Sequence, residues 1–163
     1  MERHYPLINM LAFQGCWFAC VLGGDLIGSS SVLAFLLLHL WITRGKGLGF
    51  SLLLASVGIL FDSLLSLLGL MSFGPGIWPP IPLWLAALWL AFSLTPRHAL
   101  GWLQGRSRLA AALALTMAPL SYFAGQRLQV LEIGESGYLM IALAWAITFA
   151  ALFRHRRVNH ATC

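Results

Sequence analysis

Apolar residues form six long runs along the chain, separated by short polar or flexible breaks. The runs predict helices over roughly residues 6–23, 27–43, 48–71, 81–95, 109–126 and 138–153. A membrane-crossing helix needs about 20 residues, with a range near 17–25, and only the fourth and sixth runs fall short of it. The breaks are rich in glycine, proline or charge, which end helices. The predicted fold class is therefore all-α: a polytopic integral membrane protein, a six-transmembrane-helix bundle in a single domain over residues 1–163.

Composition agrees with a membrane environment. Of the 163 residues, 60% are hydrophobic and 9% are charged, whereas soluble domains carry about 25% charged residues. The net charge of +5 does not indicate a nucleic-acid partner, because the arginines fall in the gaps between apolar runs. The first run is expected to be a retained helix and not a cleaved signal peptide, since Asn9 and Gln14 interrupt it and no small-x-small cleavage site follows.

Lysine and arginine are distributed unevenly between the two faces that six crossings would create. One face would hold the N-terminus, the second and fourth loops and the C-terminus. It would carry Arg3, Arg44, Lys46, Arg97, Arg106, Arg108, Arg154, Arg156 and Arg157. Of the 10 basic residues, only Arg127 would lie on the opposite face. Because cytoplasmic loops are enriched in Lys and Arg, this asymmetry predicts that both termini are cytoplasmic and supports the count of six spans.

One carboxylate, that of Asp62, interrupts the third apolar run. Small or polar residues recur around it at steps of three or four and trace one helix face: Ser51, Ala55, Gly58, Asp62, Ser66 and Gly69. This face is expected to turn Asp62 into the bundle, where an ionisable group costs about 2.5–3.5 kcal/mol unless compensated. Three roles stay open: a hydrogen-bonding link between helices, a proton, cation or head-group site, and an acid/base group. If its charge matters, Asp62→Asn should fold but lose function, and Asp62→Leu should be at least as stable.

Other polar side chains are within reach of Asp62 in a six-helix bundle. The residues predicted to line a ligand or lipid pocket are Asn9, Gln14, Trp17, Asp62, Tyr122 and Arg127. The first three share a face of the first predicted helix at 100° per residue. Arg127 could pair with Asp62 or Asp25, or serve as an ordinary interfacial anchor.

The predicted inner face carries a basic segment after the fourth run. Arg97, Arg106 and Arg108 are expected to contact anionic lipid head groups. His98 lies among them, and its imidazole titrates near neutrality, so His98 and Asp62 are the two candidate catalytic residues.

His39 and the two cysteines of the first run are not predicted to carry chemistry. His39, near the inner end of the second run, is expected to be a packed or snorkelling side chain. Cys16 and Cys20 share a helix face at a spacing of four, but no further donors complete a four-coordinate metal set. No metal site and no cofactor are therefore predicted.

Four stretches together resemble a known family. They are "NMLAFQGCWFACVLGG", "GILFDSLLSLLG", "LWLAALWLAFSLTPRHALGWL" and "APLSYFAGQRL". They are similar to the small bacterial inner-membrane proteins grouped as domain of unknown function 2878, and the likeness spans nearly the whole chain. The resemblance implies a multi-pass protein of the bacterial cytoplasmic (inner) membrane. Genes of this family often lie near enzymes of fatty-acid modification such as cyclopropane-fatty-acyl-phospholipid synthase, which implies a role in envelope lipid metabolism.

Three function classes follow from these observations. The first is a lipid-handling or accessory subunit linked to envelope fatty-acid and phospholipid metabolism, with membrane lipids and a lipid-modifying enzyme or other membrane protein as partners. The second is a small proton- or cation-coupled transporter that uses Asp62. The third is an intramembrane acid/base enzyme. A transporter would need a second acidic residue in mid-membrane, and an acid/base enzyme would need a second titratable group near Asp62. The sequence offers neither, so the first class is preferred.

Overall fold

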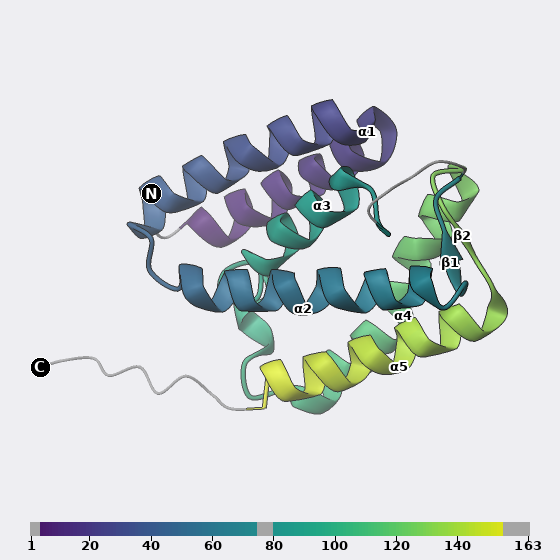
Figure 1. Ribbon diagram of the computed structural model, residues 1–163. Coiled ribbons are helices and arrows are strands. Elements are labelled where there is room, and N and C mark those ends of the chain that lie inside the picture. Colours follow the sequence, from purple (N-terminus) through teal and green to yellow (C-terminus); the bar gives the residue numbers. More distant parts are fainter. Residues whose placement is uncertain (1–3, 75–79, 155–163) are drawn as a thin grey trace, which may run out of the picture.

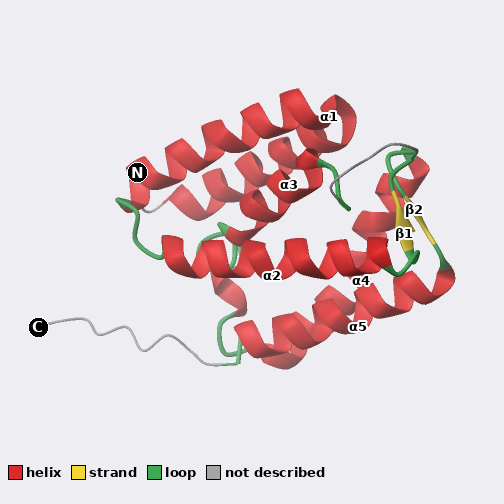
Figure 2. Cartoon of the chain, in the orientation of Figure 1, coloured by secondary structure: helices red, strands yellow, loops and turns green. Residues whose placement is uncertain are grey.

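The computed structural model describes residues 4–74 and 80–154, and these residues are all-α apart from one small two-stranded ribbon (Figures 1 and 2). The helices are α1 (Tyr5–Thr43), α2 (Leu48–Leu67), α3 (Leu83–Ser93), α4 (Ser107–Arg127) and α5 (Glu135–Leu152), with a 3₁₀ turn at Gly101–Leu103. The strands are β1 (Met71–Ser72) and β2 (Glu132–Ile133), which pair in antiparallel fashion. The all-α part of the predicted fold class is confirmed.

Helix α1 is a helical hairpin, because its path breaks at Gly24. The backbone there has φ 64° and ψ −155°, a combination that is open essentially only to glycine. The two legs then run back along each other (Figure 1), and a Cβ on Gly28 would lie 2.8 Å from the Cα of Cys20. At the far end of the hairpin, the Tyr5 hydroxyl is 2.6 Å from Nδ1 of His39. The two legs correspond to the first two predicted runs.

Helix α3 lies between α1 and α2. Hydrogen bonds join its start to α1 and its end to both helices. At its start, the backbone N–H of Trp84 donates to Oδ1 of Asp25 at 2.8 Å. At its end, the Ser51 hydroxyl donates to the carbonyl of Ser93 at 3.1 Å, next to a further bond that Asn9 donates to Leu94. The helix has 11 residues, fewer than the predicted 81–95, because Pro82 precedes it and tight turns follow Ser93.

Helices α4 and α5 form a second group that packs as an antiparallel pair beside the first (Figure 1). The β ribbon joins the groups at one end, where Met71 pairs with Ile133. At the other end of the bundle, the backbone N–H of Gly105 donates to the carbonyl of Phe153 at 3.0 Å.

Helix α2 ends at Leu67, earlier than the predicted helix 48–71. It ends there because Gly69 turns the chain with φ +69° and the following residues enter β1.

Four of these helices, α1, α2, α4 and α5, are long and apolar enough to cross a membrane. Many of their outward-facing leucines are more than half exposed, as expected for side chains that face lipid. Charge is separated along the bundle. The end that holds the α1–α2 loop and the turns between α3 and α4 carries the described basic residues Arg44, Lys46, Arg97, Arg106, Arg108 and Arg154. Arg127 lies at the other end, whereas Arg3, Arg156 and Arg157 lie outside the described residues.

Candidate functional site

Asp62 is the centre of a buried hydrogen-bonded network. Its side chain is fully buried, and its Oδ2 accepts a hydrogen bond of 2.6 Å from Nε1 of Trp89. The hydroxyl of Tyr122 lies 2.9 Å from both carboxylate oxygens and donates to them. Because the three residues come from α2, α3 and α4, the network links the two helix groups through one carboxylate.

The small face of α2 makes this network possible. Ser51, Ala55, Gly58 and Asp62 are all buried, as their spacing predicts, whereas Ser66 of the same predicted face is half-buried and Gly69, beyond the end of α2, is exposed. Gly58 is the tightest position, because a Cβ there would overlap the six-membered ring of Trp89. Glycine thus lets the indole lie directly against α2, one turn from the carboxylate that it binds.

An aromatic layer separates α4 and α5 from the rest of the bundle. Trp89 stacks on Trp145 of α5, with ring centroids 5.0 Å apart and an interplanar angle of 18°. Phe92 packs edge-on against both rings, at 5.8 Å from Trp89 and 4.8 Å from Trp145. These large side chains hold the two helix groups apart, so that space remains between their backbones.

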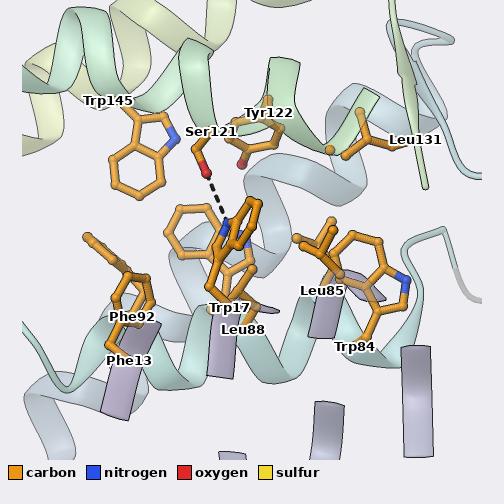
Figure 3. Close-up of a pocket in the computed structure, with 13 residues that line it drawn as sticks. Phe13, Trp17, Trp84, Leu85, Leu88, Phe92, Ser121, Tyr122, Leu131 and Trp145 are labelled. Carbon is orange, nitrogen blue, oxygen red and sulfur yellow. Dashed lines mark hydrogen bonds between the residues drawn. The ribbon is translucent and has the colours of Figure 1, made fainter. Parts of the chain in front are cut away.

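That space is a groove between α1 and α3 on one side and α4 and α5 on the other. Its narrow part is about 80 Å³ (Figure 3), and its wider part, toward Trp102, is about 380 Å³. Both parts share the lining residues Phe13, Phe92, Ser121, Tyr122 and Trp145, so they are two parts of one groove. The lining is mostly apolar and aromatic. The indole N–H of Trp17 donates to the Ser121 hydroxyl at 3.1 Å across the groove (Figure 3).

Asp62 lies behind the wall of this groove and not in it. Its two donors, Trp89 and Tyr122, line the narrow part, whereas Asp62 lines neither part of the groove. The indole N–H of Trp145 is buried and makes no hydrogen bond of good geometry, although it interacts with the Tyr122 hydroxyl. The carboxylate therefore orients groove-lining side chains and does not itself face the groove.

The structure divides the other residues predicted to line a pocket with Asp62. Trp17 lines the narrow part of the groove and Gln14 lines its wider part. Asn9 is fully buried elsewhere, where it holds the chain around α3: it donates to the carbonyl of Leu94 at 3.2 Å and accepts from the N–H of Ala99 at 3.3 Å.

Arg127 is exposed at the end of α4. In the part of the chain that the structure describes, no ion pair joins it to Asp62 or Asp25. Both carboxylates have other partners, since Asp25 binds the N–H of Trp84 and Asp62 binds the network above. This placement agrees with the anchor alternative and not with the ion pair.

His98 belongs to a second polar cluster at the basic end of the bundle. Its ring lies 4.8 Å from that of Tyr5 and 5.2 Å from that of His39, both in edge-on contact. His39 is buried, as expected for a packed residue, and Nδ1 bonds to the Tyr5 hydroxyl. The two candidate catalytic residues, Asp62 and His98, therefore sit in separate clusters with different partners.

Sequence reasoning missed two residues of these clusters. Trp89 lies in one of the stretches that resemble the family but is not among the predicted site residues, and neither is Tyr5. The signal for Trp89 was present, because Gly58 and Asp62 lie one turn apart on the same face and together fit a bulky hydrogen-bond donor. No comparable signal marks Tyr5, whose role depends on the hairpin at Gly24. Within residues 4–74 and 80–154, no group of three or more His, Cys, Asp or Glu side chains could hold a metal ion.

Comparison with known proteins gives one match. Neither a curated protein nor a solved structure matches the chain. The family model described as "Protein of unknown function (DUF2878)" matches residues 6–151, which include every helix of the structure except the ends of α1 and α5. The chain therefore belongs to the family of proteins grouped as domain of unknown function 2878.

Proposed function

We propose that this protein is a lipid-handling or accessory subunit of the bacterial inner membrane, and that its groove holds an acyl chain of a membrane lipid. The observation that carries the proposal is the groove itself: a largely apolar, aromatic-lined space between α1–α3 and α4–α5. The partners are membrane lipids and, as the accessory role requires, a lipid-modifying enzyme of the same membrane.

The proposal includes six crossings with both termini in the cytoplasm. Each leg of the α1 hairpin has roughly 19 residues, or about 28 Å at 1.5 Å per residue, close to the hydrocarbon thickness of about 30 Å. Helix α3 is too short to cross alone, so its flanking turns complete the fourth crossing. The separation of basic residues to one end of the bundle supports this orientation, because positive charge favours the cytoplasmic side.

Cysteine labelling tests the orientation. In a variant that lacks the native cysteines, Gly134→Cys should react with a membrane-impermeant maleimide added to intact cells, because Gly134 is exposed at the outer end. Lys46→Cys and Arg106→Cys should react only after the cells are permeabilised. Labelling of Lys46→Cys from outside would contradict both the orientation and the number of crossings.

Three features of the groove favour an acyl chain as the occupant. The groove lies among helices whose outer faces carry exposed leucines, so a lipid tail is the molecule at highest local concentration. Its wider part, about 380 Å³, lies within the range of about 300–1,000 Å³ that ligand pockets show. Its polar groups are few and uncharged. The Ser121 hydroxyl accepts a hydrogen bond from Trp17 and can still donate its own proton to an ester carbonyl or a short polar segment of a lipid.

A groove-filling substitution tests the occupant. Ser121 lines both parts of the groove and its side chain is exposed, so Ser121→Trp should fill the space without disturbing the buried core. Cross-linking to a phospholipid with a diazirine-bearing acyl chain should fall at least about threefold, a change of about 0.7 kcal/mol. Leu120→Trp is the matched control, because Leu120 is 56% exposed and faces away from the groove. Equal cross-linking in both variants would contradict the proposal.

A further inference from the structure

The geometry points to a second site, at the basic end of the bundle: a pocket that binds a phosphate group, as a monoester or a diester. The pocket has a volume of about 560 Å³. Its polar lining comes from three separate segments that meet there: Tyr5, Thr43, Arg44, Lys46, Arg97 and His98. The inference goes beyond the proposed acyl-chain groove, with which this pocket shares no lining residue.

The pocket concentrates positive charge. Arg44 and Lys46 come from the loop between α1 and α2, and Arg97 comes from the turns after α3, 51 residues further along the chain than Lys46. Three cations around one cavity match the one or two negative charges and the several acceptor oxygens of a phosphate diester or monoester. Arginine in particular can form two parallel hydrogen bonds to such oxygens.

Arg97 is held in place before any ligand arrives. Its guanidinium lies over the ring of Phe50, 4.8 Å from the centroid, a cation–π contact. The same side chain crosses Gly47, where φ is +84° and a Cβ would lie 2.5 Å from Nη1. Glycine at this position therefore allows both the left-handed backbone turn and the close approach of the Arg97 side chain. A fixed arginine loses less conformational entropy on binding than a free one.

Packed aromatic rings complete the wall beside the cations. His98 lies against Tyr5 and His39 through ring contacts, and the Tyr5 hydroxyl is fixed by Nδ1 of His39 at 2.6 Å. The rings of His98 and Tyr5 thus reach the pocket from a packed aromatic cluster. This arrangement gives the site a rigid side, which a diffuse basic surface lacks.

The described residues place no carboxylate at this end of the bundle. Asp62 is buried in its own network, and the other acidic residues of the described ranges lie at the opposite end: Asp25, Glu132 and Glu135. Glu2 lies outside the described residues. The pocket cations therefore have no acidic partner in the part of the chain that the structure describes, and an external anion is the natural counterion. Arg106 and Arg108, which the sequence groups with Arg97, do not line the pocket.

Two double variants with the same change in charge test the site. Arg44→Gln/Lys46→Gln removes two pocket cations, and Arg106→Gln/Arg108→Gln removes two cations from the same end outside the pocket. Purified wild-type protein in phosphatidylcholine nanodiscs is titrated with inorganic phosphate, and separately reconstituted with phosphatidylglycerol, with binding read by native mass spectrometry. Thermal unfolding shows whether each variant is folded, and the single variant Arg97→Gln serves if the pocket double variant is not.

We expect the pocket variant to bind its anion at least tenfold more weakly than wild type, and the matched control to change less than threefold. If the pocket variant loses only phosphatidylglycerol, the phosphate comes from a lipid head group. If it also loses inorganic phosphate, the ligand is a soluble phosphate compound. Equal losses in the two double variants, or binding of neither probe by wild type, would overturn the site. Neither result bears on the groove, which is tested by Ser121→Trp.

Discussion

Replacing Gly58 by alanine is expected to lower the free energy of unfolding by about 1–3 kcal/mol, the usual cost of overpacking a well-filled core. The added methyl group would overlap the ring of Trp89. That ring cannot move aside easily, because it bonds to Asp62 at 2.6 Å and stacks on Trp145. The measurement is unfolding of the purified protein in detergent micelles by titration with a denaturing detergent.

Gly49→Ala provides the matched control for this prediction. Gly49 lies on the same helix α2, and no atom lies within 4 Å of a Cβ built there. Alanine at this position should leave stability unchanged or raise it by up to about 1 kcal/mol, because alanine favours helix over glycine. In a Trp89→Leu background the cost of Gly58→Ala should largely disappear. An equal response of the two glycines would show that close packing against Trp89 is not what Gly58 provides.

The sequence predicts well what depends on one helix alone. The predicted face is buried from Ser51 to Asp62, because side-chain direction along a helix follows from spacing. It fails at Gly69, which is exposed beyond the end of α2. The break at the glycines of the first loop follows from backbone sterics in the same way. The family was also identified, and the family model confirms it over residues 6–151.

The sequence predicts less about which helices meet. Trp17, Gln14 and Asn9 share a helix face. Asn9 nevertheless bonds to the chain just after α3, whereas the other two line the groove. The difference arises because one helix contacts different neighbours along its length. Likewise Arg97 joins Arg44 and Lys46 around one pocket, although Arg106 and Arg108 are its nearest basic residues in sequence. In both cases the neighbours of a residue depend on how distant segments pack, which the local sequence pattern does not predict.

The structure also changes what is expected of the hydrophobic substitution Asp62→Leu. From the sequence, removing a lone intramembrane carboxylate should relieve a desolvation cost. In the structure the carboxylate accepts from Trp89 and Tyr122, so leucine would leave two buried donors without an acceptor. Orphaned buried groups cost about 1–3 kcal/mol each in soluble proteins, and hydrogen bonds between membrane helices average about 0.6 kcal/mol.

Asp62→Leu is therefore expected to be about 1–3 kcal/mol less stable than wild type, whereas Asp62→Asn should be close to wild type. The asparagine carbonyl can still accept from Trp89, and its amide can donate to the Tyr122 hydroxyl oxygen. If Asp62 acts by orienting these two groove-lining side chains, the asparagine variant also keeps acyl-chain cross-linking and restores a deletion strain, and the leucine variant loses both. An asparagine variant that folds with wild-type stability but fails to restore the strain would show that the charge of Asp62, and not its hydrogen bonds, is what the protein requires.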